Sequence, residues 1–296
     1  MKLPDFPWDE LTPFAERAKQ HPGGLIDLSV GTPVDSTPDF IQEALKSAAN
    51  SPKYPLTAGT PELRAAIKDW AIRELGASGE FGVLPLIGSK ELVAWLPTLL
   101  QSKTLLYPEI AYPTYLVGGL IAQINVRAVG FDAANWPNAE LAWINSPSNP
   151  TGRISSDHEL IGAINWARNN GVVVSDECYL EFGSSSKPKS ILAFSGGDNR
   201  NLLALHSLSK RSSMAGYRAA MLIGDPELIA RILEVRKHAG MMVPLPVQQA
   251  MIAALSDNKH VEQQRARYND RKAKVRGAIE RHGFRIEHSE AGLYLW

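Results

Sequence analysis

The sequence contains a single cysteine, Cys178, so no disulfide can form within the chain. This excludes a small disulfide-stabilised secreted domain and favours an intracellular location, with Cys178 as a small buried apolar residue. An excess of charge is also absent, because 31 basic side chains are matched by 31 acidic ones. A neutral chain gives no electrostatic reason to expect nucleic acid or a membrane surface as a partner.

Long apolar runs are missing too. No segment is long and apolar enough to span a bilayer, and the start of the chain contains no apolar core of the signal-peptide type. We therefore expect a cytoplasmic protein, and we expect no metal ion. The 296 residues are nevertheless 44% hydrophobic, which is ample for one large domain and a smaller one.

Short apolar runs alternate with amphipathic segments through the middle of the chain, which is typical of a mainly parallel sheet sandwiched by helices. Ser156 and Glu159 have the spacing of a helix capping box, and Asp225 precedes Pro226 as an N-cap. We predict an α/β fold with strands within 81–88, 104–110, 125–131, 141–147, 171–179, 202–209 and 219–225.

The two ends of the chain differ from this middle part. The N-terminal end has a Pro-rich lead, a predicted strand over 25–31 and a predicted helix over 38–50, and a long charged helix starts near residue 259. We expect a large domain over 51–258 and a smaller discontinuous domain made of 1–50 and 259–296.

Two charged residues stand at the ends of apolar runs, where ligands of parallel sheets gather. Lys210 closes the run that begins at Asn201, and a lysine there is costly to desolvate unless its amine is used. Asp176 directly follows a buried strand, so it either pairs with a cation or caps the next turn. Taken alone, the simpler interpretation of Lys210 is an exposed lysine.

Three further strand ends carry polar or aromatic residues. Ser89 and Lys90 open a helix whose free amides can bind phosphate, although a simple glycine turn has the same pattern. Tyr112 either stacks on a flat ring or packs in the core. Asn149 lies in a loop that two prolines and a glycine make rigid, which suggests that the loop positions something.

The segment around Lys210 adds a possible phosphate site. In an extended segment Ser207 and Ser209 point to the same side, and Arg218 supplies a bidentate clamp for a dianion. Pyridoxal phosphate requires a lysine for its aldehyde, an acid for its ring nitrogen, an aromatic face, donors for its phenolic oxygen, and phosphate ligands. The residues at these strand ends meet each requirement.

These segments resemble the class I/II aminotransferases among the fold-type I pyridoxal-phosphate enzymes. The resemblance is carried by "NSPSNPTG" (145–152), "SDECYLEF" (175–182) and "SLSKRSSMAGYR" (207–218). Longer stretches, "YPLTAGTPELR" (54–64) and "VRKHAGMMVPLPVQ" (235–248), are similar to the actinobacterial N-succinyldiaminopimelate aminotransferases of lysine biosynthesis. The resemblance implies a fold-type I architecture, a pyridoxal 5'-phosphate cofactor, transaminase activity and a homodimer.

The resemblance also implies roles for individual residues. Lys210 forms the internal aldimine with the cofactor, and its freed amine acts as general base and acid. Asp176 keeps the ring nitrogen protonated, and Tyr112 stacks on the ring. Asn149 and Tyr179 hydrogen-bond the phenolic oxygen.

The remaining roles concern the phosphate, the partner subunit and the substrate. The resemblance implies that the phosphate is held by Ser89, Lys90, Ser207, Ser209 and Arg218. Tyr54 is matched to a tyrosine that reaches the phosphate of the partner subunit. Gly31 is matched to a glycine that lets the backbone approach the substrate carboxylate.

The implied reaction is a ping-pong exchange of amino groups between N-succinyl-LL-2,6-diaminopimelate and 2-oxoglutarate. The alternatives are another class I/II aminotransferase acting on aspartate, an aromatic or another amino acid, β-elimination at the same site, a cofactor-binding regulator, and an inactive remnant that binds cofactor. Three basic residues, Arg236, Lys237 and His238, lie in the last turn of a predicted helix. Their charges either stabilise the helix by interacting with its dipole or bind the succinyl carboxylate.

The sequence stops at Trp296, inside an apolar aromatic run with no turn signal. A natural domain rarely ends in this way, so we expect a fragment that lacks the C-terminal part of the small domain. The resemblance places the arginine that clamps the substrate α-carboxylate beyond this point. We therefore expect the chain to build most of the cofactor site without its main substrate anchor.

Overall fold

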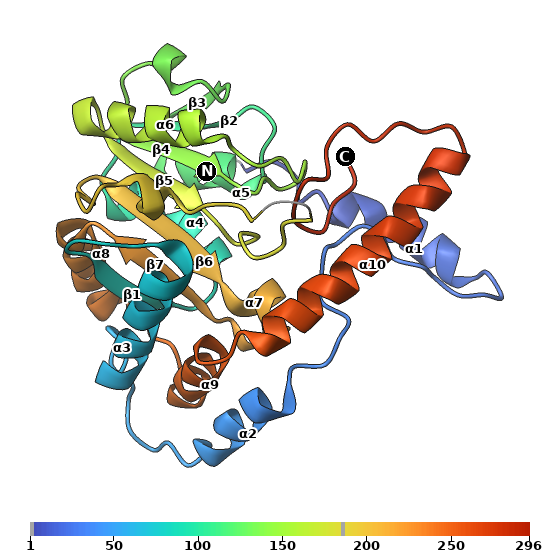
Figure 1. Cartoon of the computed structure of the whole chain (residues 1–296), viewed down its shortest axis with the longest axis horizontal. Helices are drawn as coiled ribbons and strands as arrows, with labels where there is room; N and C mark the ends of the chain where they lie inside the picture. Colours follow the sequence, from blue (N-terminus) through green and yellow to red (C-terminus); the bar gives the residue numbers. More distant parts are fainter. Residues whose placement is uncertain (1–2, 185–186) are drawn as a thin grey trace.

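The computed structural model describes residues 3–184 and 187–296, and its centre is a seven-stranded sheet (Figure 1). The order of the strands is β1-β7-β6-β5-β4-β2-β3. All seven predicted strands are confirmed: β1 (Gly82–Leu86), β2 (Thr104–Pro108), β3 (Asn125–Val129), β4 (Leu141–Asn145), β5 (Val172–Asp176), β6 (Leu202–Ser207) and β7 (Ala220–Gly224).

The sheet is mainly parallel, as predicted. β7 pairs antiparallel with both of its neighbours, β1 and β6, whereas the other pairs of adjacent strands are parallel. The start of β7 therefore lies at the same edge of the sheet as the carboxyl ends of the other strands. This edge is where we look for the site.

Helices bury both faces of the sheet. Along β6, Leu202 and Ala204 belong to one apolar core, and Leu203 and Leu205 belong to the core on the opposite face. Alternate side chains of a strand point to opposite faces, so a strand buried on both sides is continuously apolar. The covering helices are α3 (Pro61–Trp70), α4 (Ser89–Leu99), α5 (Thr114–Ala122), α6 (Asp157–Asn169), α8 (Pro226–Ala239) and α9 (Leu245–Leu255).

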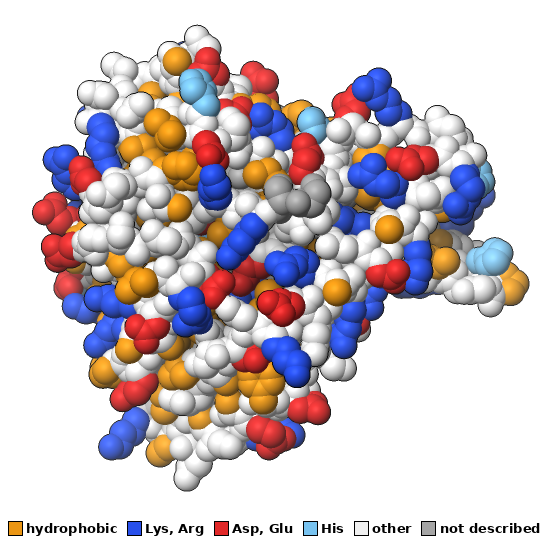
Figure 2. Space-filling view, in the orientation of Figure 1, with side chains coloured by type: hydrophobic (Ala, Val, Ile, Leu, Met, Phe, Trp, Pro, Cys, Tyr) orange, Lys and Arg blue, Asp and Glu red, His pale blue; other side chains and the backbone are white. Residues whose placement is uncertain are grey.

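The predicted helix caps are present. Ser156 and Glu159 form the capping box at the start of α6. Asp225 caps α8 by accepting hydrogen bonds from the backbone amides of Glu227 and Leu228. Within the described ranges, no helix has the length and apolar character needed to cross a membrane. Figure 2 shows basic and acidic side chains interspersed over the visible face, in keeping with the zero net charge.

The terminal segments lie largely outside the sheet. The chain forms α1 (Thr12–Lys19) and α2 (Asp39–Ser47), and α10 (Lys259–Arg281) leaves the body beside the N-terminal segment (Figure 1). The predicted strand over 25–31 is wrong: no described strand pairs with this segment, and Ile26 and Leu28 are each 82% exposed. A strand needs a neighbour for its backbone hydrogen bonds. The division into two domains stays a prediction.

The segment before α2 is tied to α10 through Asp35. Its carboxylate accepts hydrogen bonds from Arg271 at 2.6 and 2.7 Å and from the side-chain amide of Gln264 at 2.7 Å. The hydrogen bonds from Arg271 are the main cause that lowers the pKa of Asp35 from 3.8 to about 2. A carboxyl group with a lowered pKa stabilises the fold above its unfolded pKa, and this stability is lost as the pH falls through the folded value.

Replacing Asp35 by asparagine is therefore expected to lower the free energy of unfolding by about 1 kcal/mol at neutral pH, the upper range for a partly exposed ion pair. Urea denaturation at a series of pH values should show the difference from the wild type shrinking as the pH falls from 3.8 toward about 2. Asp270→Asn, which breaks the exposed pair with Lys274, is the control and should have a smaller effect. A difference that does not change with pH would contradict the assignment.

Candidate active site

The segment that carries Lys210 turns from strand into helix at the edge of the sheet. Ser207 ends β6 and caps the short helix α7 (Leu208–Arg211), because its hydroxyl accepts the backbone amide of Ser209 at 3.1 Å. The prediction that Ser209 continues an extended segment is wrong, since this cap starts a helical turn. The two serine hydroxyls nevertheless meet, at 2.9 Å, because the cap brings them together.

Lys210 lies half-buried at this edge, in the middle of α7. Burial lowers the pKa of its amine, the thiol of Cys178 acts in the opposite direction, and the positive charge of Arg218 lowers the pKa further. A lowered pKa increases the fraction of neutral amine, which is the nucleophilic form. Lys210 therefore has the environment of a reactive lysine.

Asp176 is the last residue of β5, and its side chain is buried. One carboxylate oxygen accepts a hydrogen bond from the hydroxyl of Tyr115 at 2.8 Å, and the other accepts the backbone amide of Cys178 at 3.2 Å. Burial raises the pKa of Asp176, whereas the hydrogen bonds from Cys178 and Tyr115 lower it. A buried carboxylate held by two donors is prepared to pair with a cation.

Tyr115 was not predicted from the sequence. It lies three residues after Tyr112, so both side chains emerge near the start of α5, and their rings meet edge to face at 6.0 Å. The only signal in the sequence was this spacing. Burial raises the pKa of Tyr115 well above its usual value, so the hydroxyl keeps its proton and acts as a donor to Asp176.

Arg218 reaches the same edge because it precedes β7, the strand that runs in the opposite direction. Its backbone has a φ of 56°, and its guanidinium lies against Gly88, at the position a Cβ would occupy. Ser89 begins α4 directly after Gly88, and among the described residues no side chain accepts a hydrogen bond from the amides of this first turn. A guanidinium and free helix amides together form an anion site.

Gly88→Ala is expected to disrupt this anion site, because the new Cβ collides with Arg218 and the φ of 94° disfavours any residue with a Cβ. Loss of a charge-assisted contact should weaken binding of pyridoxal 5'-phosphate by about 10- to 100-fold. Binding of pyridoxal, which lacks the phosphate, should change little. Gly130→Ala is the matched control, because a Cβ there meets nothing within 4 Å. Equal losses for both compounds would contradict a phosphate role.

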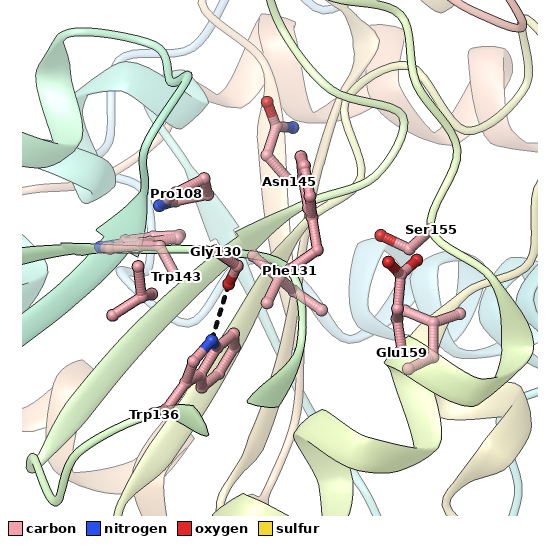
Figure 3. Close-up of a pocket in the computed structure, with 11 residues that line it drawn as sticks. Pro108, Gly130, Phe131, Trp136, Trp143, Asn145, Ser155 and Glu159 are labelled. Carbon is pink, nitrogen blue, oxygen red and sulfur yellow. Dashed lines mark hydrogen bonds between the residues drawn. The ribbon is translucent and has the colours of Figure 1, made fainter. Parts of the chain in front are cut away.

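The loop after β4 is held by Asn145, a residue that sequence reasoning missed. Its side-chain oxygen accepts the backbone amide of Asn149 at 2.7 Å, and its amide donates to the carbonyls of Pro147 and Asp176. Asn145 also lines the small apolar pocket in Figure 3, beside Trp143. Within the described chain the side chain of Asn149 makes no hydrogen bond, so it is available to a ligand.

Tyr112 lies half-buried at the end of the loop after β2. Burial raises the pKa of its phenol, and the charges of Asp176 and Arg218 act on it in opposite directions. Both charged groups are therefore near enough to Tyr112 to affect its phenol. The exposed part of the ring can face a flat ligand.

Tyr179 follows β5, and its hydroxyl lies 2.8 Å from the hydroxyl of Tyr294. Burial raises the pKa of both phenols. Gly31 reaches the same place from the N-terminal segment, because a Cβ there would lie 3.2 Å from the hydroxyl of Tyr294. Tyr294 is a third residue that was not predicted, after Tyr115 and Asn145, because its sequence stretch predicted only an apolar aromatic run.

Other predicted residues lie apart from this constellation. Tyr54 is 96% exposed, and Lys90 directs its amine over the ring of Phe6 at 4.8 Å, so only its backbone faces the site. Arg236 is fully buried and donates two hydrogen bonds to Glu91 at 2.8 and 3.0 Å. Its neighbours in the last turn of α8 are exposed; they are Lys237 and His238, both near Glu234.

The polar side chains and free amides at this edge fit pyridoxal 5'-phosphate. A lowered amine pKa suits the aldehyde, a buried carboxylate suits the pyridinium nitrogen, and a free carboxamide with a phenol suits the phenolic oxygen. Two hydroxyls, a guanidinium and free helix amides suit the phosphate.

Comparison with known proteins gives the same result. The model of the family "Aminotransferase class I and II" matches residues 24–296. The 4-dedimethylamino-4-oxo-anhydrotetracycline transaminase OxyQ of Streptomyces rimosus is 50% identical, over 100% of this chain and 84% of that protein. A probable aminotransferase of Mycobacterium tuberculosis is also 50% identical, over 99% of this chain and 72% of its own length.

A solved structure of a probable N-succinyldiaminopimelate aminotransferase from Thermus thermophilus superposes with a TM-score of 0.89 at 26% identity. The match covers 98% of this chain and 83% of that one.

Proposed function

The chain belongs to the class I and II aminotransferases, which depend on pyridoxal 5'-phosphate, and from that premise we propose that its substrates are N-succinyl-LL-2,6-diaminopimelate and 2-oxoglutarate. The observation that carries the amino-transfer chemistry is the reactive environment of Lys210 at the edge that also holds Asp176. The substrate assignment is supported by the sequence stretches over 54–64 and 235–248 and by the similarity to the Thermus protein.

In this proposal each side chain has one task. The cofactor, when bound, supplies an aldehyde for the amino group and a ring that accepts electrons. Lys210 removes the proton from the substrate α-carbon and returns it as a general acid, for which its lowered pKa is suited. Asp176 holds a positive charge on the ring nitrogen, and Tyr115 keeps the carboxylate in place.

The other groups bind and orient the ligand. Tyr112 covers one face of the ring, while Asn149 and Tyr179 donate to its phenolic oxygen. The phosphate is held by the backbone amides of Ser89 and Lys90 and by the side chains of Ser207, Ser209 and Arg218. We propose that Gly31, which has no side chain, lets the backbone approach the substrate carboxylate.

The proposal includes a homodimer. Tyr54 is 96% exposed, and the N-terminal segment exposes apolar side chains, including Ile26 and Leu28 at 82% each and Val34 at 78%. Exposed apolar side chains favour burial against a partner, and in the proposed dimer a second copy would bring Tyr54 to the partner's phosphate site. Sedimentation equilibrium should give the mass of two chains, and a monomer at micromolar concentration would contradict the proposal.

A second substrate is favoured by a specific observation, the 50% identity with OxyQ. The name of that protein describes amination of a ketone on a polycyclic ring system, so a similar ketone is the competing candidate for this chain. Both candidates use the same cofactor chemistry and the same Lys210. They differ in whether the substrate carries carboxylates.

Single-turnover spectra with the cofactor-loaded protein can separate the candidates. We expect N-succinyl-LL-2,6-diaminopimelate to change the absorbance of the cofactor-loaded protein at least about tenfold faster than free LL-2,6-diaminopimelate at equal concentration, because an added carboxylate contact contributes about 1.5–3 kcal/mol. Addition of 2-oxoglutarate should then reverse the change in absorbance. Faster amination of 4-dedimethylamino-4-oxo-anhydrotetracycline than of 2-oxoglutarate would overturn the assignment.

A further inference from the structure

Tyr294 lies near the cofactor site, and the proposed function gives it no task. Its hydroxyl lies 2.8 Å from that of Tyr179, and the two rings meet at 68° with their centroids 5.6 Å apart. We propose that Tyr294 is a positioning residue, which donates its hydroxyl proton to Tyr179 and so fixes the hydroxyl that Tyr179 presents to the cofactor's phenolic oxygen. The inference rests on the role proposed above for Tyr179.

The backbone around Tyr294 is tied to the loops that carry the other ligands of that oxygen. The amide of Ala291 donates to the carbonyl of Gly152, in the loop of Asn149, at 2.9 Å. The amide of Gly292 donates to the carbonyl of Phe182, in the turn of Tyr179, at 3.0 Å. The segment that carries Tyr294 is therefore bonded to both loops, which fixes the position of Tyr294 relative to Asn149 and Tyr179.

Gly152 is required for this bridge. Its φ is 74°, a conformation that favours glycine, and a Cβ there would lie 2.5 Å from the carbonyl oxygen of Ala291. The hydroxyl of Ser289 further fixes the segment by donating to the carbonyl of Tyr294 at 3.0 Å. These contacts place the Tyr294 ring without any help from a ligand.

The chemistry of the two hydroxyls decides the direction of the hydrogen bond. Burial is the main cause that raises the pKa of each phenol, so both keep their protons at neutral pH. A hydroxyl has one proton to donate, and an ionised phenolic oxygen can only accept. When Tyr179 donates to the cofactor, the bond between the tyrosines must therefore run from Tyr294 to Tyr179. Donors in series polarise one another, which strengthens the second bond.

Gly31 leaves the space in which the Tyr294 hydroxyl sits. The three atoms nearest to a Cβ at Gly31 all belong to Tyr294, and the closest, the hydroxyl oxygen, is 3.2 Å away. This contact is tighter than most Cβ contacts, so a side chain at position 31 would shift the hydroxyl from the position in which it meets Tyr179. The N-terminal and C-terminal segments thus meet at this hydroxyl.

The test compares the affinity for pyridoxal 5'-phosphate with that for 3-deoxypyridoxal 5'-phosphate, which lacks the phenolic oxygen. Tyr294→Phe should weaken binding of pyridoxal phosphate about fivefold, as expected for one neutral hydrogen bond, and leave the deoxy analogue unchanged. We define the affinity ratio as the affinity for pyridoxal 5'-phosphate divided by that for the deoxy analogue. Tyr179→Phe should lower this ratio about tenfold or more, because the hydrogen bond from Tyr179 goes to a charged oxygen. Equilibrium titration of cofactor-free protein, followed by absorbance, gives both constants.

Tyr268→Phe is the matched control. Tyr268 packs in the same apolar cluster as Tyr179 and Phe182, and its hydroxyl has no hydrogen-bond partner among the described residues. Loss of this oxygen should leave the affinity ratio unchanged. A partly unfolded variant binds less of both compounds, which lowers the stoichiometry of both titrations and leaves the ratio intact.

Gly31→Ala is a second variant that tests Tyr294, because it displaces the Tyr294 hydroxyl without removing it. It should also lower the ratio of the two affinities. The inference is overturned if Tyr294→Phe lowers both affinities equally or changes neither, while Tyr179→Phe lowers the ratio. If Tyr179→Phe itself leaves the ratio unchanged, the role proposed for Tyr179 fails and the inference fails with it.

Discussion

Replacing Lys210 by alanine is expected to abolish the visible absorbance that the protein shows with bound pyridoxal phosphate. The same substitution should lower amino transfer by about 10⁴-fold or more, because one amine serves as both nucleophile and proton carrier. Lys90, a second lysine at this edge, is not placed to replace it, because its amine lies over the ring of Phe6 at 4.8 Å.

Two controls separate the chemistry of Lys210 from its charge. Lys210→Arg keeps the positive charge and much of the length but cannot form the covalent bond, so it should also lose the absorbance. Lys274→Ala removes an exposed lysine paired with Asp270 and should retain it. Spectra of the purified variants at equal cofactor concentration are sufficient, and a Lys210→Ala protein that keeps the absorbance would refute the assignment.

The second large effect is expected for Asp176→Asn. The substitution keeps the size of the side chain and removes the charge that pairs with the ring nitrogen. Loss of one partner of a buried ion pair costs about 3–5 kcal/mol, so the affinity for pyridoxal phosphate should fall by roughly 100-fold or more. Fluorescence or absorbance titration of the cofactor-free protein measures this loss.

The cofactor-free form should respond in the opposite direction. Burial raises the pKa of Asp176 above 3.8, so ionising it in the folded protein costs stability as the pH rises from 3.8 through the folded value. Asparagine removes this cost, and Asp176→Asn should therefore unfold at a higher temperature than the wild type at pH 7 when no cofactor is present. A loss of cofactor affinity together with a loss of cofactor-free stability would indicate misfolding and contradict the ion-pair role.

Much of the fold followed from local features of the sequence. The seven strands were predictable because a strand buried on both faces is a continuous apolar run, as in β6. The caps at Ser156 and Asp225 were predictable because a cap involves residues only two or three positions apart. Lys210 and Asp176 were identified by the same logic, since a charged residue at the end of an apolar run is unusual.

Features that depend on distant partners were not predictable. The segment 25–31 has the composition of a strand, but no described strand lies beside it, and its backbone stays irregular. Composition cannot distinguish these outcomes, because strand formation depends on a neighbouring strand that is far away in the sequence. The prediction for Ser209 was wrong for a local reason instead: the hydroxyl of Ser207, two residues before it, starts a helical turn there.

The sequence by itself determined the chemical groups of the site and their order along the chain, because each follows directly after an apolar run. Only the tertiary structure decided how these groups are held. Tyr115 reaches Asp176 across 61 positions of the chain and Tyr294 reaches Tyr179 across 115, and a hydroxyl within an apolar stretch gives no sign of its partner. Such contacts form because packing of the sheet brings separate segments of the chain to one edge, where their polar side chains come within hydrogen-bond distance.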